Sequence, residues 1–326
     1  MGPEHYCLDD TSFIGLLDNS ANIVADIHAL VDVAEQIISE GQSISVPDSI
    51  ELIQISEDLL FYNLYEVDFS NSDISGDLDR DSLQRFLALR NKLDTVPIKN
   101  GLSSSLYNSS GACVREVCVS GSTEIIVHRQ IKGEICFALL LIGPNGPVAG
   151  EYHLNIEGKL SNKIYALRST SDLLLYARWL IQNISQTEED FFFLWGRAFP
   201  LLLMSNGLTF KRFEGNYQAL HNDVLNHLAF LNDDFPHIWR ECNEDFVCFQ
   251  RTAKSSGINL SNEGDNTRKS TRKMKQRVAS FPKGDVVCEL HTKLSYDKNR
   301  IHFHPPIKAI GGENVLIGIF VDHLEV

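Results

Sequence analysis

The period of the hydrophobic pattern changes along this chain, and that change is the strongest constraint on what it can fold into. Apolar side chains recur every three to four residues within 20–40, which predicts an amphipathic helix. Further helices are predicted at about 49–62 and 81–93. A stretch rich in Gly, Ser and Asn then interrupts the pattern at 101–112. We therefore predict that residues 1–100 form a mainly helical domain.

Apolar and polar residues alternate with a period of two after this break, which predicts strands joined by short turns. Helical patterns return further along the chain. We predict a central α+β domain over 113–250, in which helices pack on one face of an antiparallel sheet. The predicted strands are 114–119, 124–129, 134–142 and 147–156, and the predicted helices are 171–184, 188–204 and 216–231.

The last part of the chain, residues 284–326, is predicted to form a compact antiparallel β-meander, so that the whole chain has the fold class α+β. Its strands are expected at 286–294, 300–304 and 315–321. Because side chains alternate between the two faces of a strand, the polar residues of the first two strands should share one face. These are Glu289, His291 and Lys293 on the first strand and Arg300, His302 and His304 on the second.

Charge is distributed unevenly along the chain. Residues 1–100 hold 5 Lys and Arg against 19 Asp and Glu, whereas residues 251–326 hold 13 against 8. The acidic N-terminal region is therefore expected to dock on the basic tail or on a partner. Residues 251–283 are predicted to be a basic linker or helix that contacts phosphates of nucleic acid, with a solvated linker helix as the alternative. The basic residues are Arg268, Lys269, Arg272, Lys273, Lys275 and Arg277.

The pattern of apolar residues and cysteines limits where such a chain operates. No run approaches the roughly 18 apolar residues that a membrane span needs. The start of the sequence lacks the basic residues and apolar run of a signal peptide. We expect a cytoplasmic protein that has no contact with a membrane. The 7 cysteines include no CxxC pair, so we expect them to be buried as small apolar residues.

Two chemistries fit the predicted polar face. Cationic groups can stabilise the negative charge that develops on a phosphate while a nearby histidine moves a proton. Alternatively, the pair His302 and His304 could bind zinc together with His291 or His323. A polar sheet face that is simply solvated is the third interpretation.

The segments CELHTKL, NRIHF and VLIGIFVDHL resemble the strand order of the RelE/HigB/ParE toxin superfamily. Members of that family are small sheets that bind ribosomes or other nucleic-acid-bearing targets, and RelE cleaves mRNA. Arg300 matches the arginine of the family's middle strand, His323 lies where the last strand carries a histidine, and Lys293 matches a position that is often basic. The ending is also similar to that of large uncharacterised bacterial proteins of phage-defence and toxin loci.

The resemblance implies a bacterial toxin-like or phage-defence protein whose C-terminal domain acts on RNA or on an RNA-containing target. Arg300 and Lys293 would hold the scissile phosphate, and a histidine would serve as general acid or base. The candidates are His291, His302, His304 and His323. No metal or other cofactor is expected, because the 2′-hydroxyl of RNA is the nucleophile. The alternative is a non-enzymatic component of a larger assembly that binds nucleic acid or protein.

Overall fold

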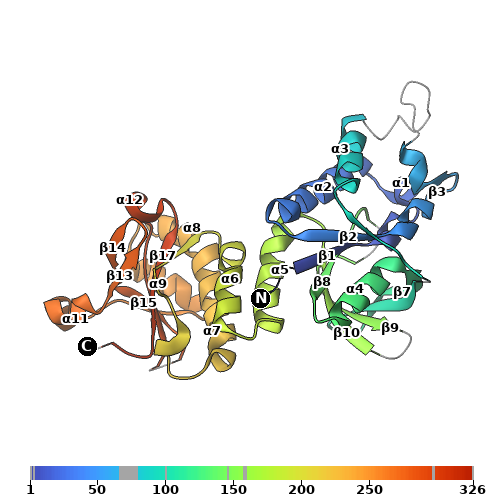
Figure 1. The fold of residues 1–326 in the computed structure, drawn as a ribbon. Coiled ribbons are helices and arrows are strands. Elements are labelled where there is room, and N and C mark those ends of the chain that lie inside the picture. Colours follow the sequence, from blue (N-terminus) through green and yellow to red (C-terminus); the bar gives the residue numbers. More distant parts are fainter. Residues whose placement is uncertain are drawn as a thin grey trace. The chain divides into compact units, whose positions relative to one another are not determined.

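The computed structural model describes residues 2, 4–65, 80–99, 101–144, 147–156, 160–295 and 298–324. The chain forms two compact units, Gly2–Tyr176 and Ala177–Val326, called here the N-terminal and C-terminal units (Figure 1). Both combine helices with a sheet, so the predicted α+β class is confirmed. Two units stand in place of the four predicted segments, because strands from the first and second of those segments pair in one sheet.

The N-terminal unit is built on an eight-stranded mixed sheet with the strand order β5-β2-β1-β8-β10-β9-β6-β7. The five neighbouring strands β5, β2, β1, β8 and β10 are parallel. Strands β9, β6 and β7 follow β10 in the sheet and pair in antiparallel fashion. The N-terminal region therefore contributes three parallel strands besides its helices. The strands are β1 (Glu4–Leu8), β2 (Ser43–Pro47), β5 (Asp94–Val96), β6 (Leu102–Asn108), β7 (Cys113–Ser120), β8 (Ile135–Leu140), β9 (Gly150–Ile156) and β10 (Leu160–Leu167).

Helices cover both faces of this sheet. The predicted helices near 20–40 and 81–93 are confirmed as α2 (Ile23–Ser39) and α3 (Arg80–Arg90), which lie together on one side (Figure 1). Helix α4 (Gly121–Ile131) packs on the opposite face, where Ile125 and Ile126 join Cys7 and Leu139 in the core. Neighbouring side chains of β1 point to opposite faces of the sheet, and both faces are buried. Tyr6, on the face opposite to Cys7, contacts Tyr176 of α5 (Thr170–Asn183).

Two local predictions in the N-terminal unit are wrong. Residues 124–129 are part of α4 rather than a strand, because the hydroxyl of Ser120 accepts a hydrogen bond from the Thr123 amide and caps a helix there. No helix spans 49–62, where the buried Ile55 would lie on the opposite side of a helix from the buried Ile50 and Phe61. That stretch holds the 3-10 turns Asp48–Leu52 and Phe61–Tyr65 and the strands β3 (Gln54–Ser56) and β4 (Leu59–Leu60).

The C-terminal unit is built on a five-stranded sheet with the order β11-β17-β16-β15-β12. Strands β15 to β17 are antiparallel neighbours, as the predicted meander requires, while β11 runs parallel to β17. The two outer strands come from residues before 284, so the meander is the centre of a larger sheet rather than a separate domain. The strands are β11 (Leu202–Met204), β12 (Asn259–Ser261), β15 (Leu290–Lys293), β16 (Arg300–His304) and β17 (Val315–Val321).

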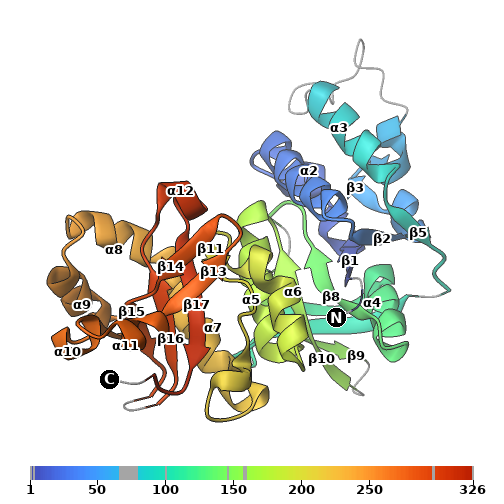
Figure 2. The same ribbon diagram turned by 60° about the vertical axis from the view of Figure 1, so that its left-hand side comes forward.

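One face of this sheet packs on helices and the other on a two-stranded ribbon (Figure 2). Phe303 of β16 is fully buried and contacts Phe235 at a ring distance of 5.5 Å. On the other face, Leu316 and Ile319 form a core with the ribbon residues Phe281 and Val286. The elements are α6 (Glu188–Ala198), α7 (Tyr217–Asp233), α8 (Phe235–Glu241), α9 (Phe246–Ser255), α10 (Asp265–Arg268), α11 (Thr271–Lys275), α12 (Lys308–Gly311) and the ribbon strands β13 (Val278–Phe281) and β14 (Gly284–Val287).

The cysteines depart in part from the expectation. Cys7, Cys136 and Cys288 are buried thiols, but Cys242 and Cys248 form a disulfide across the turn between α8 and α9. That pairing depends on the helical hairpin, which brings the two Cα atoms to 5.6 Å from each other. Within the described part of the chain, no helix is both long and apolar enough to span a bilayer.

Candidate functional site

The predicted hairpin forms and places four of the predicted catalytic residues side by side. Strands β15 and β16 pair so that His291 lies opposite His302 and Lys293 lies opposite Arg300. The two imidazole rings are 4.9 Å apart. The pair of basic side chains is therefore two residues along each strand from the pair of imidazoles.

A buried ion pair covers this part of the hairpin, and its carboxylate was not predicted. Glu263 follows β12 and Arg277 directly precedes β13, so that an edge strand and the ribbon bring the two residues together. Nε of Arg277 lies 2.8 Å from Oε1 of Glu263, and Nη2 donates to Oε2 at 3.0 Å. The exposed fractions of the side chains are 1% for Arg277 and 4% for Glu263. Such a bidentate geometry fixes the orientation of the carboxylate.

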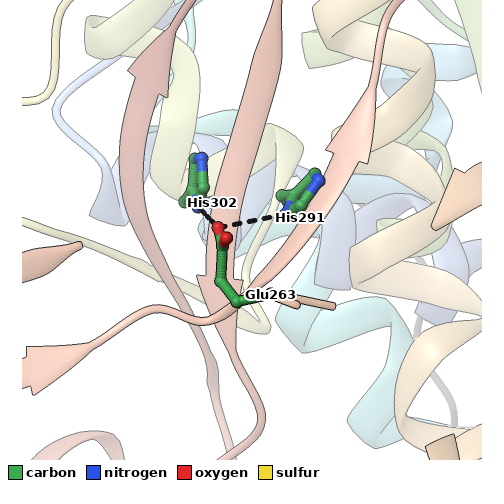
Figure 3. A group of neighbouring side chains, drawn as sticks. All are labelled: Glu263, His291 and His302. Atoms are coloured by element: carbon green, nitrogen blue, oxygen red, sulfur yellow. Dashed lines mark ion pairs between the residues drawn. The ribbon is translucent and has the colours of Figure 1, made fainter. Parts of the chain in front are cut away.

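The same carboxylate faces both imidazoles, as Figure 3 shows. Oε1 of Glu263 lies 3.8 Å from Nδ1 of His291 and 4.0 Å from Nδ1 of His302. Nδ1 of His302 is also 3.2 Å from the carbonyl oxygen of Cys288. A neutral His302 that donates Nδ1–H to this carbonyl keeps a lone pair on Nε2.

Buried imidazole atoms in this cluster remain without a hydrogen bond. Among the described residues, neither Nδ1 of His291 nor Nε2 of His302 has a hydrogen-bonding partner. Buried polar atoms are nearly always satisfied, and each exception needs an explanation. A ligand that supplies the missing partner is one such explanation.

Burial and positive charge keep both histidines neutral. Burial and, after it, the nearby cations of Arg300 and Lys293 together lower the pKa of His291 to about 3. Burial likewise holds the pKa of His302 well below its ordinary value. At neutral pH both rings are therefore uncharged and able to accept a proton.

These residues line a pocket of about 220 Å³, called here the acid–base pocket. Its walls carry three cationic side chains against one carboxylate, so its net charge is positive. A positive, partly desolvated pocket attracts an anion, and a bound anion would raise the pKa of the imidazoles. The lining residues are Ser261, Asn262, Glu263, Gly264, Arg277, His291, Lys293, Arg300, His302 and Leu324.

The zinc site considered from sequence does not form as predicted. Glu263, His291 and His302 are the group of possible metal ligands found within the described ranges, their ligand atoms lying within 4.8 Å of one another. His304 and His323 are not members of it. Arg277 occupies both oxygens of Glu263, and a dication would add charge to a pocket that is already positive. The electrostatics therefore favour an anion over a metal ion.

The other predicted site residues lie outside this pocket. His304 faces a neighbouring groove, with Nδ1 at 2.7 Å from the carbonyl oxygen of Pro305. His323 is exposed beyond the end of β17.

The predicted phosphate-contacting segment needs one correction, because Arg277 is buried in its ion pair with Glu263 instead of facing solvent. The segment forms two short helices, α10 and α11, instead of one. Arg268, Lys269, Arg272 and Lys275 are exposed, and Lys273 is half-buried.

Comparison with protein-family models, with curated proteins and with solved structures finds no match to this chain. The resemblance to RelE-like toxins therefore remains a prediction. What the structure defines is an α+β chain whose C-terminal unit holds a buried Glu–Arg pair and two buried histidines in a pocket lined by three cationic side chains. Since a fold does not determine a function, the function must be argued from this site.

Proposed function

We propose that the C-terminal unit binds a phosphate group of RNA in the acid–base pocket and cleaves the adjoining phosphodiester bond by general acid–base catalysis. One observation carries the proposal: Lys293 and Arg300 lie opposite each other in the same pocket as the paired His291 and His302. Two cations can hold the two non-bridging phosphate oxygens and stabilise the charge that develops on them. Two imidazoles can accept one proton and deliver another.

The cleavage step balances without an added cofactor. One neutral imidazole accepts the proton of the 2′-hydroxyl, and the 2′-oxygen attacks phosphorus. The bond from phosphorus to the 5′-oxygen breaks, and that oxygen takes a proton from the second imidazole, which is protonated. The products are a 2′,3′-cyclic phosphate and a 5′-hydroxyl. Only RNA supplies this nucleophile, so DNA would not be cut.

Substrate binding itself would create the protonated histidine. Burial, and after it the positive neighbours, hold the pKa of His291 low in the free protein, and an anionic phosphate offsets the charge of those neighbours. Glu263, at 3.8 to 4.0 Å from both rings, then stabilises the imidazolium. Arg277 positions this carboxylate without touching the substrate in this scheme.

The experiment is a cleavage assay on purified protein with single-stranded RNA, together with induced expression scored for growth and RNA integrity. Arg300→Ala and His302→Ala should lower the rate about 10²- to 10⁴-fold, because each removes a charge or proton-transfer group used in the transition state. Arg240→Ala is the matched control, since Arg240 is an exposed arginine of α8 that bonds to its own helix. Circular dichroism checks that each variant folds. Full activity in Arg300→Ala, or products without a cyclic phosphate, would refute the mechanism.

A non-enzymatic role is the second candidate, and the exposed basic residues of α10 and α11 favour it. Arg268, Lys269, Arg272 and Lys275 can neutralise phosphates along a strand without any chemistry. In that case binding would fall steeply with salt while no product forms. The same cleavage assay separates the two candidates when RNA binding is also measured at salt concentrations from about 50 to about 200 mM, the range over which affinities that depend on phosphate contacts fall steeply.

A further inference from the structure

A second cavity of the C-terminal unit adjoins the acid–base pocket. Its volume is about 710 Å³, and Asn262 lines both cavities. Its wall includes the half-buried aromatic rings of Trp239 and Phe246 and the side chain of His304. Ile307 and Leu290 add apolar surface. We call this cavity the aromatic groove.

The indole of Trp239 is held in place from behind. It stacks on Phe235 at a ring distance of 5.5 Å and an angle of 14°, and meets the edge of Phe249 at 5.6 Å. Phe235 in turn packs against Phe303 in β16, next to His302. The aromatic wall is therefore tied by direct contacts to the strand that carries the reactive imidazole and Arg300. A platform fixed in this way loses little conformational entropy when a planar ligand stacks on it.

Polar groups are placed among the apolar surface of the groove. The amide of Asn262 can donate and accept, the carboxylate of Glu289 can accept, and His304 offers a ring nitrogen. Glu289 is kept in position by Arg268, whose Nε lies 3.1 Å from its carboxylate. Stacking surfaces combined with a few hydrogen-bonding groups are what the exposed edge and face of a nucleobase require.

We infer that the aromatic groove binds an unpaired nucleobase of the strand whose phosphate lies in the acid–base pocket, so that the substrate is single-stranded RNA. The inference rests on the proposed function for the position of the phosphate, and it deepens that function by naming the substrate class. A base in a duplex is stacked and paired on both sides, whereas an unpaired base is free to turn out onto an aromatic ring. Since Asn262 lines both cavities, a base and its own phosphate can reach them together.

Intrinsic fluorescence offers a direct test in the full-length chain. The chain has 3 tryptophans, and Trp179 and Trp195 are buried with exposed fractions of 5% and 3%, so quenching by a stacked base reports on Trp239. Nucleoside 5′-monophosphates should quench the emission, and inorganic phosphate should not. The monophosphates should also bind at least about tenfold more tightly than inorganic phosphate in a competition assay, given the usual strength of base stacking. Trp239→Phe should remove the signal while keeping most of the affinity.

Binding of labelled oligonucleotides completes the test. Trp239→Ala should weaken binding of single-stranded RNA by about 5- to 100-fold, the range typical of losing one stacked base. Phe193→Ala is the matched control, because Phe193 is an exposed aromatic residue of α6 in the same unit. This variant should bind single-stranded RNA as tightly as the wild type does. A perfectly paired RNA duplex should bind more weakly than the single strand.

The outcomes separate this inference from the proposed cleavage. Equal binding of single strand and duplex, or unchanged affinity in Trp239→Ala, would overturn the nucleobase site even if the protein cleaves RNA. Quenching and base-dependent affinity without any cleavage product would instead uphold the nucleobase site and remove the catalytic proposal. Thermal unfolding of each variant checks that it is folded, so that a change in binding or quenching reports on the groove.

Discussion

Each of the two units buries a cluster of charged residues, and the clusters differ in which of their described atoms lack a hydrogen bond: nitrogens of Arg115 in one and of the imidazoles in the other. In the N-terminal unit, Asp9 pairs with Arg115 at 2.9 Å, and Asp10 accepts hydrogen bonds from Ser120 and from the amide of Gly121. Both carboxylates are buried, and Asp10 binds the first turn of α4, whose N-cap is Ser120. In the C-terminal unit, Glu263 and Arg277 are also paired, but Nδ1 of His291 and Nε2 of His302 have no hydrogen bond within the described part of the chain.

The carboxylates of the N-terminal cluster are engaged, whereas the C-terminal cluster keeps imidazole nitrogens that can bind a ligand. Asp9 and Asp10 lie where the order of the parallel strands reverses between β1 and β8, the usual place for a ligand crevice in such sheets. Their oxygens, however, are engaged by Arg115 and by the cap of α4. The C-terminal cluster instead combines imidazole atoms that lack a hydrogen bond with a pocket whose lining carries excess positive charge. Position in the fold alone would have favoured the other site.

The largest expected effect comes from breaking the buried pair in each unit. Glu263→Ala leaves Arg277 charged and unpaired, and Arg115→Ala does the same to Asp9, so each should lower the free energy of unfolding by about 3 to 5 kcal/mol. Urea denaturation measures both. The two variants should differ in function, because only Glu263→Ala should also change phosphate binding, Glu263 being part of the lining of the acid–base pocket.

A double variant controls for simple loss of stability. Glu263→Leu combined with Arg277→Met removes the pair without leaving a buried charge, and it should recover most of the lost stability. Recovery of stability together with phosphate binding equal to the wild type would contradict a role for the pair in the acid–base pocket. Impaired phosphate binding in folded Arg115→Ala protein would contradict the predicted difference in function between the two clusters.

A smaller effect is expected at Gly318, where the ribbon approaches the sheet of the C-terminal unit. A methyl group there would collide with the sulfur of Cys288 and lie 3.0 Å from Cβ of Ala279, so Gly318→Ala forces the ribbon away. We expect a loss of about 1 to 3 kcal/mol in the free energy of unfolding. Because Arg277 directly precedes the ribbon strand β13, phosphate binding should weaken as well.

Gly196→Ala provides the control in the same unit. Gly196 lies within α6, and nothing is within 4 Å of the position a methyl group would take. This variant should be neutral or slightly more stable, since alanine favours a helix. A Gly318→Ala protein as stable as the wild type would show that the ribbon does not hold the site together.

The two clusters should also respond oppositely to acid. The pKa of His291 is lowered in the folded state to about 3, so below its ordinary value of 6.5 the unfolded chain binds the proton more readily. The C-terminal unit therefore loses stability as the pH falls from about 6.5 towards 3, by up to about 1.4 kcal/mol per pH unit for each buried histidine. Burial raises the pKa of Asp9, so protonation of that carboxyl favours the folded N-terminal unit instead.

Tryptophan emission follows the acid response of the C-terminal unit, because all 3 tryptophans belong to that unit. The denaturation midpoint followed by emission should fall between pH 7 and pH 4. His227, whose pKa burial lowers to about 4, contributes in the same direction. The double variant His291→Gln and His302→Gln should therefore keep only part of the acid sensitivity. An unchanged pH dependence in that variant would rule out the assigned protonation states.

Strong periodic patterns made much of the fold predictable from the sequence. The apolar spacing of α2 and the alternation in β16 survive in the structure, because burial of one face determines both. The strand predicted at 124–129 failed because Ile125, Ile126 and Val127 have strand-like side chains, while the Ser120 cap that starts α4 is a local detail. The parallel pairing of β1 with β8 joins residues more than a hundred positions apart, which no local pattern records.

The candidate site was predictable only where it lies on one hairpin. His291, Lys293, Arg300 and His302 were found because strand alternation places them on one face. Glu263 was missed, since it is one of two acidic residues in a basic segment and becomes part of the site only through tertiary packing. Arg277 was predicted as a surface residue for the same reason. The aromatic residues of the groove, Trp239 and Phe246, had no distinguishing spacing either.

The most direct test of the account is an NMR titration of the imidazole nitrogens of His291 and His302 with and without inorganic phosphate. The account predicts that both rings stay neutral in phosphate-free solution down to acidic pH, and that phosphate raises the pKa of at least one of them. The effect should vanish in Arg300→Ala, which loses a cation of the pocket, and persist in Arg240→Ala. Imidazole pKa values that do not respond to phosphate, or that respond equally in Arg300→Ala, would contradict an anion-binding acid–base site.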